Sequence, residues 1–118
     1  MAEHLDANVL LTLQQVMEGE YPQLLDAFLG DSEERLRLLQ AACQRGEGEA
    51  LRRAAHSFKG SCSNMGAAQL AEHCQALEEA AQSGQLQRAA GLIEQIEREF
   101  AIVRILCRAE RQRFIGHD

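Results

Sequence analysis

The sequence predicts an all-α protein, an antiparallel up-and-down four-helix bundle with a short N-terminal capping helix. Its composition is the first indication, because aromatic residues make up only 4% and there is one proline, while Leu, Ala, Glu, Gln and Arg dominate and favour helices. The second is that apolar residues recur every three to four positions in four segments with short connections. Helices that each carry one apolar face bury it best in a shared core.

Capping and proline signals define the first two helices. Asp6 is a suitable N-cap for a short helix that ends near Met17, and residues 1–19 are expected to form the capping segment. A long second helix begins at Pro22, because proline is tolerated in the first turn of a helix. It ends at the glycine-containing loop 45–49.

Three further helices follow. The third runs to Met65, where Gly66 provides a stop signal, and the fourth covers residues 67 to about 82. The fifth carries apolar residues as far as Cys107 and then becomes polar. We therefore expect the tail at 110–118 to be frayed.

Length and charge limit the possible functions. The 118 residues fit one domain, with the bundle at about 20–109. A net charge of -6 and scattered arginines argue against nucleic acid as a partner. No apolar run approaches the roughly 18 residues that cross a bilayer, and the N-terminus lacks signal-peptide features. We expect a cytoplasmic monomer with no membrane partner.

The third helix contains an unusual group, His56, Lys59 and Gly60. A helix turns by about 100° per residue, so His56 lies about 140° and Gly60 about 180° from the core-facing Leu51. The histidine therefore faces away from the core. A glycine inside a helix costs about 1 kcal/mol relative to alanine. Because Gly60 faces outward, it fills no core space and instead clears the surface for a large partner.

Lys59 is the only lysine among twelve Lys and Arg residues, and it lies one turn from His56, so the two side chains are neighbours. A compact ammonium group suits the neutralisation of a mobile anion. A histidine is partly neutral and nucleophilic near pH 7. An accessible nucleophile beside a cation is what acceptance of a phosphoryl group requires. The chain has no glycine-rich phosphate loop, so ATP is not the expected donor.

The stretch AHSFKGSCSNMGA, residues 55–67, closely resembles the signature of histidine-containing phosphotransfer (HPt) domains. In that signature an alanine, the phosphorylated histidine, an apolar residue, Lys-Gly and a glycine stop follow in order. DAFLGDSEERLRLL and LAEHCQALEEA look like the second and fourth helices of the family, and the resemblance covers roughly residues 20–100. This sequence departs from the signature at Phe58, where the family usually has leucine. The change lies at a core position.

This resemblance implies a free-standing, single-domain phosphorelay intermediate of the bacterial type. His56 would be the phosphorylated residue, Lys59 the charge neutraliser and Gly60 the clearance for the partner. The partners would be receiver domains of hybrid sensor kinases and of response regulators, whose aspartates give and take the phosphoryl group. These receivers would supply Mg²⁺, so the chain would need no cofactor of its own and would have no ATP-dependent kinase activity.

Helical geometry adds further candidates. If the third and fourth helices form a tight hairpin, Glu78 lies nearly level with His56 and outside the core. It is then expected either to accept a hydrogen bond from His56 or pair with Lys59, or to be an ordinary solvated glutamate. The receiver is expected to meet the exposed face of the third helix, with apolar contacts from the second helix alongside. That face includes three further residues, Arg52, Arg53 and Ser63, of which Ser63 is also a possible supporting residue.

Two other interpretations stay open. One is a zinc site, because one cysteine falls on the apolar stripe of each bundle helix, at Cys43, Cys62, Cys74 and Cys107. Structural zinc ligands usually come in close sequence pairs, however, and buried reduced cysteines are common core residues. The other is a binding-only bundle in which His56 is incidental, an interpretation that leaves Gly60 and Lys59 unexplained.

Overall fold

The computed structural model describes residues 2–115, and these residues contain helices and turns but no strand. Within this range no helix has the combination of length and apolar character that crossing a membrane requires. The elements in chain order are α1 (Ala7–Met17), the 3-10 turn η1 (Glu18–Glu20), α2 (Tyr21–Gln44), α3 (Gly48–Asn64), α4 (Ala68–Gln82), the 3-10 turn η2 (Leu86–Arg88) and α5 (Ala89–Ile115).

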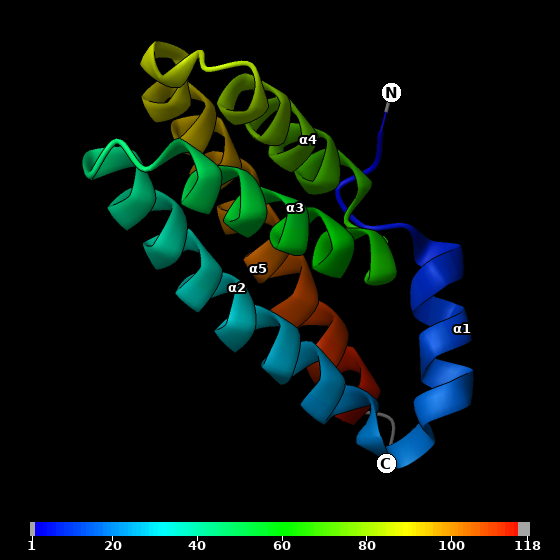
Figure 1. Ribbon diagram of the computed structural model, residues 1–118. Helices are drawn as coiled ribbons and strands as arrows, with labels where there is room; N and C mark the ends of the chain where they lie inside the picture. Colours follow the sequence, from blue (N-terminus) through cyan, green and yellow to red (C-terminus); the bar gives the residue numbers. More distant parts are fainter. Residues whose placement is uncertain (1, 116–118) are drawn as a thin grey trace.

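Helices α2 to α5 form the predicted antiparallel bundle (Figure 1). Each packs against two neighbours, in the order α2, α3, α4, α5 and back to α2. Short connections reverse the chain between successive helices, and each contains a glycine with positive φ: Gly46 at 66°, Gly66 at 74° and Gly84 at 75°. Glycine adopts this conformation without the strain that a side chain would cause. The glycine stops in the sequence therefore mark the turns of the bundle.

The bundle core consists of the apolar stripes of its four helices. Phe58 is fully buried, as expected for a residue on the core-facing side of its helix. The other large side chains that are fully buried are Tyr21, Leu25, Leu39, Leu51, Leu70, Leu77, Ile96 and Val103. Because these residues recur at the helical period, each helix turns one apolar face to the core and its other faces to solvent.

The cysteines pack as part of this core. Cys62, Cys74 and Cys107 are buried, and Cys43 is half-buried. Hydrogen bonding to Cys74 and burial raise the pKa of Cys62, and burial raises the pKa of Cys107 to about 12, so both thiols are protonated at neutral pH. Among residues 2–115, no three His, Cys, Asp or Glu side chains gather as a metal site.

The N-terminal segment crosses one end of the bundle. Asp6 caps α1 as predicted, since its Oδ1 accepts hydrogen bonds from the amides of Asn8 at 2.9 Å and Val9 at 3.4 Å. Its own amide donates to the carbonyl of Gly66 at 2.8 Å, which ties α1 to the α3–α4 turn. A Cβ at Gly66 would lie 2.9 Å from the Cβ of Val9, so the glycine also permits close packing here.

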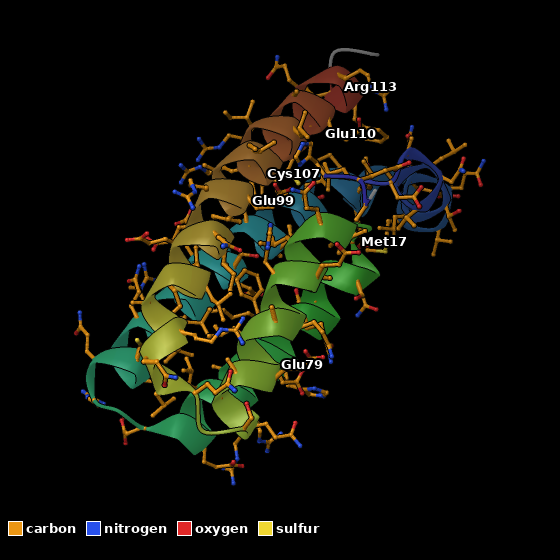
Figure 2. All side chains as sticks on the ribbon, turned by 90° about the horizontal axis from the view of Figure 1, so that it is seen from above. Met17, Glu79, Glu99, Cys107, Glu110 and Arg113 are labelled. Carbon is orange, nitrogen blue, oxygen red and sulfur yellow. The ribbon has the colours of Figure 1, made fainter. Side chains whose placement is uncertain are left out.

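A histidine in this segment reaches a buried carboxylate. The Nδ1 atom of His4 lies 2.5 Å from Oε2 of Glu99 on α5, which is labelled in Figure 2. The Glu99 side chain is 3% exposed and that of His4 is 43% exposed. A buried carboxylate needs a hydrogen-bonding partner, and His4 provides one from a segment far away in the sequence.

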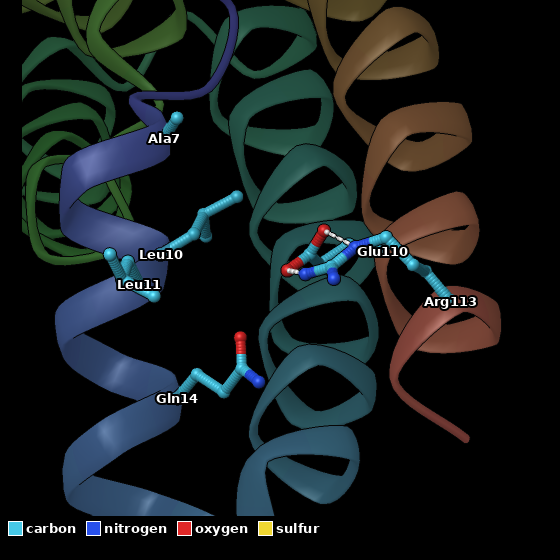
Figure 3. Close-up of a pocket in the computed structure, with 6 residues that line it drawn as sticks. All are labelled: Ala7, Leu10, Leu11, Gln14, Glu110 and Arg113. Carbon is cyan, nitrogen blue, oxygen red and sulfur yellow. Dashed lines mark hydrogen bonds and ion pairs between the residues drawn. The ribbon is translucent and has the colours of Figure 1, made fainter. Parts of the chain in front are cut away.

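The expectation of a frayed tail from residue 110 is wrong as far as Ile115, because α5 continues to that residue; residues 116–118 lie outside the described residues. Side-chain contacts with the start of α2 stabilise this last part. The Tyr21 hydroxyl donates to Glu110 at 2.9 Å, and the Tyr21 ring packs edge-on against Phe114 with ring centroids 5.4 Å apart. Glu110 also pairs with Arg113 at 2.7 Å, as Figure 3 shows.

Candidate functional site

The predicted residues of α3 lie on its solvent-facing side. Buried Ala55 and Phe58 anchor the helix on the core, and this orientation turns His56 outward, with its side chain 62% exposed. Lys59, one turn later, is 26% exposed. The wheel geometry derived from the sequence therefore describes the orientation of this helix correctly. The imidazole is open to a macromolecular partner.

Glu78 on α4 joins the histidine and the lysine. Its Oε2 lies 2.9 Å from Nδ1 of His56, and its Oε1 accepts a hydrogen bond from Nζ of Lys59 at 2.7 Å. The tight turn at Gly66 sets the two helices in this register. Both contacts that the sequence suggested for Glu78 are thus present together, and with a side chain 12% exposed it is not an ordinary solvated glutamate.

The charge state of Glu78 determines which ring nitrogen of His56 is free. The hydrogen bond from Lys59, followed by that from His56, lowers the carboxyl pKa of Glu78, against an opposing effect of desolvation. The carboxylate is therefore ionised at neutral pH and can only accept hydrogen bonds. Consequently Nδ1 of His56 carries the proton, and in the neutral ring Nε2 has the lone pair. Nε2 is therefore the ring nitrogen with an available lone pair.

Gln75 belongs to the same cluster and was not identified from the sequence. Its Oε1 accepts a second hydrogen bond from Nζ of Lys59 at 2.9 Å, and its Nε2 donates to Glu79 at 2.7 Å. A usable signal existed, because Gln75 precedes Glu78 by three residues and so lies on the same face of α4. The two α4 residues hold the ammonium group beside His56 while leaving one of its three N–H donors unassigned.

Gly60 occupies open space. A Cβ atom built at this position would meet nothing within 4 Å, and the residue has an ordinary helical backbone rather than a positive φ. Neither packing nor backbone conformation requires a glycine here. The loss of helix propensity is thus not offset by packing among residues 2–115.

The remaining predicted residues are less closely connected to the histidine. Arg52 and Arg53 both bind the carboxylate of Glu49, at 2.7 Å and 3.2 Å. The hydrogen bond from Arg52, with a smaller contribution from Arg53, lowers the pKa of Glu49 to about 2. Ser63 is exposed two turns after His56, and its side chain makes no hydrogen bond among residues 2–115. The structure therefore assigns no supporting contact to Ser63.

A concave pocket at the α1 end of the bundle does not belong to this site. It is about 350 Å³ in volume and lies between α1 and the end of α5 (Figure 3). Its lining residues include Leu10, Leu11 and Arg113, and none comes from α3 or α4. The candidate site is instead an exposed helical surface, which suits contact with another protein rather than enclosure of a small molecule.

Comparisons with known proteins agree on one family. The family model described as Hpt domain matches residues 23–105. Among solved structures, the crystal structure of histidine-containing phosphotransfer protein B from Pseudomonas aeruginosa PAO1 is similar, with a TM-score of 0.92 and 65% sequence identity. The match covers 96% of this chain and 98% of that chain. No curated protein sequence matches the chain.

Proposed function

Since the chain belongs to the histidine-containing phosphotransfer domain family, we propose that it is a phosphorelay intermediate whose His56 carries the phosphoryl group. The group arrives from an aspartate of one receiver domain and leaves to the aspartate of another. The observation that carries the proposal is the exposed imidazole held at Nδ1 by Glu78, with Lys59 on the same carboxylate. Together these groups form a nucleophile, its positioning residue and a cation.

The transfer step uses the lone pair of Nε2. This nitrogen attacks the phosphorus of a receiver aspartyl phosphate in line, so that a P–N bond forms while the P–O bond to the aspartyl carboxyl group breaks. The electron pair of the broken bond remains on the aspartate, which becomes a carboxylate. The ring becomes a phosphoimidazolium, because its Nδ1 proton stays in place. Glu78 stabilises the positive charge that develops on the ring.

Lys59 and Gly60 act on the approaching group rather than on the imidazole. The free N–H of the Lys59 ammonium is available to a phosphoryl oxygen, which offsets the negative charge that accumulates during transfer. Gly60 leaves room for the receiver backbone to bring its aspartyl phosphate to within bonding distance of Nε2. The reverse step follows the same path, since the acceptor aspartate then attacks the phosphorus and Nε2 departs.

The same proposal includes the partners of the chain, its metal requirement and its location. The receivers come from hybrid sensor kinases and response regulators and bring the Mg²⁺ that transfer needs. The chain itself has no ATP-dependent kinase activity and works as a cytoplasmic monomer. A phosphorelay of this kind requires the carrier to dissociate rapidly, and a small, open docking surface around His56 is consistent with such a transient interface.

The test follows label from phosphorylated, Mg²⁺-loaded receiver domains of the same genome onto this protein. We expect wild-type protein to acquire label that is acid-labile and base-stable, as a phosphohistidine is, and His56→Gln to acquire none. His73→Gln is the matched control, since His73 lies half-buried on α4 outside the cluster, and it should be labelled like wild type. Label that persists in folded His56→Gln, or its absence from wild type with every receiver, would refute the proposal.

A further inference from the structure

The cations around His56 differ in how they are neutralised. Three of them pair with carboxylates: Lys59 with Glu78, and Arg52 and Arg53 with Glu49. Arg35 on α2 is the exception. Among residues 2–115 it forms no ion pair, and its side-chain partner is the neutral hydroxyl of Ser57, the residue directly after His56. Its positive charge is therefore not balanced by a neighbouring carboxylate.

The Arg35 guanidinium also has unused hydrogen-bonding capacity. Its Nη1 donates to Oγ of Ser57, whereas its Nε is buried without a hydrogen-bond partner. A guanidinium presents five N–H donors in a planar fork that matches the two oxygens of a carboxylate. A single hydroxyl satisfies only a small part of this capacity. No carboxylate among residues 2–115 pairs with this guanidinium, so it can bind a carboxylate once it leaves Ser57.

Arg35 lies at one end of an apolar groove along the seam of α2 and α3. The groove measures about 200 Å³. Its lining includes Leu24, Ala27, Phe28 and Asp31 of α2 and Ser61 and Met65 of α3. Since the two helices are antiparallel, Arg35 one turn after Asp31 faces Ser57 one turn before Ser61. The contact between them therefore marks the end of the groove nearer to His56.

The partner at this surface is acidic where it meets the histidine, because a receiver domain must present an aspartate there. The present chain is itself acidic, with a net charge of -6, so its overall field repels an acidic surface that approaches it. A local cation that is not already neutralised offsets this repulsion at the point of contact. Lys59, Arg52 and Arg53 serve this purpose less well, since each already binds a carboxylate.

We propose that Arg35 is a docking residue that leaves Ser57 and pairs with a carboxylate of the receiver domain; this inference rests on the proposed phosphotransfer function. The apolar groove beside it receives apolar side chains of the same partner. Arg35 acts by positioning the receiver and does not touch the reacting atoms. Its contribution falls on association of the two proteins and therefore depends on salt.

Three variants separate charge from internal hydrogen bonding. Arg35→Gln removes the charge, Arg35→Lys retains it, and Ser57→Ala frees the guanidinium. The donor is the phosphorylated receiver that transfers fastest to wild type. At low salt we expect Arg35→Gln to lower kcat/KM about fivefold, mainly by raising KM. Near 0.5 M salt the difference from wild type should shrink to about twofold or less. Arg35→Lys should retain most of the rate. The kcat/KM of Ser57→Ala should equal or exceed that of wild type, because the Arg35 guanidinium no longer has to break its hydrogen bond to Ser57.

Phosphoramidate, a small phosphodonor that needs no docking, provides the second arm. Wild type and Arg35→Gln should be labelled on His56 by phosphoramidate at equal rates. Equal rates from the receiver at low salt would overturn the docking role while leaving the proposed function intact. A similar loss with both donors would also overturn it, because Arg35 would then act on His56 or on the fold. If wild type takes no label from any receiver, both the proposed function and the docking role are refuted.

Discussion

Replacement of Glu78 is the most direct test of how the fold activates His56. Glu78→Ala removes both the 2.9 Å contact to Nδ1 of His56 and the 2.7 Å ion pair with Lys59. Lys59 still has its hydrogen bond to Gln75 at 2.9 Å, so a cation remains near the site. The imidazole, however, loses the acceptor that fixes its tautomer and its orientation. The main consequence should therefore be a weaker nucleophile rather than an unfolded protein.

The expected magnitude follows from the exposure of the two partners. A hydrogen bond to a charged group contributes about 1.5–3 kcal/mol. The imidazole is 62% exposed, so water replaces part of the lost interaction and the lower end applies. About 1.4 kcal/mol in the transition state corresponds to about a tenfold slower phosphoryl uptake. Glu78→Gln retains an oxygen that can accept from Nδ1 but lacks the charge, and we expect about a threefold loss.

Two measurements on the same variants test whether Glu78 fixes the tautomer of His56 and raises its reactivity. Uptake of label from phosphoramidate gives the rate without any contribution from receiver docking. The ¹⁵N chemical shifts of the His56 ring report the tautomer, which should be mainly Nδ1–H in neutral wild-type protein and shift towards Nε2–H in Glu78→Ala. Unchanged tautomer populations together with an unchanged rate would refute the argument that Glu78 prepares Nε2. A purely structural role would alter stability without altering the tautomer.

Three further predictions concern stability. Gly60→Ala should raise the free energy of unfolding by about 1 kcal/mol in urea titrations, because a Cβ there meets open space. The same variant should take up the phosphoryl group more slowly from a receiver but not from phosphoramidate. A lower free energy of unfolding would contradict the stability prediction. His4→Ala should lower the free energy of unfolding by about 1–3 kcal/mol, because the buried Glu99 loses its hydrogen-bonding partner. Adding Glu99→Gln should recover part of this loss, and an unchanged urea midpoint would show that the pair is not stabilising. Neighbouring cations hold the carboxyl pKa of Glu78 and of Glu110 below the usual range. Each therefore contributes stability that is present above the unfolded-state pKa and is lost as pH falls through the folded-state pKa. We expect stability to decline below about pH 4.5, and to decline less steeply after Glu78→Gln and Glu110→Gln; identical pH profiles would contradict this.

The bundle and the outward position of His56 could be predicted because they depend on local patterns. Apolar periodicity identifies the buried face of each helix, and the angular position of His56 follows from the helical repeat within α3 alone. Asp6 as N-cap and Gly66 as a stop signal are similarly local, since each acts through the backbone of its own segment. The structure agrees with all of these predictions.

The errors and omissions concern side chains that meet across helices. The polar sequence after Cys107 gives no local reason for order, and the helix nevertheless continues to Ile115 because Tyr21, at the start of α2, binds Glu110 and packs on Phe114. Periodicity could place neither this contact nor the pairing of Arg35 with Ser57. Both depend on how two helices are aligned along their axes.

The sequence by itself therefore determined the helices, their buried faces and the exposed group of His56, Lys59 and Gly60, because these follow from spacing within one helix. Only the tertiary structure decided the role open to Glu78, which from the sequence was equally consistent with a solvated glutamate. The turn at Gly66 sets α4 against α3 so that one carboxylate reaches both the imidazole and the ammonium group. Such a contact depends on the relative register of two helices, which the turn and the packing of the core set together.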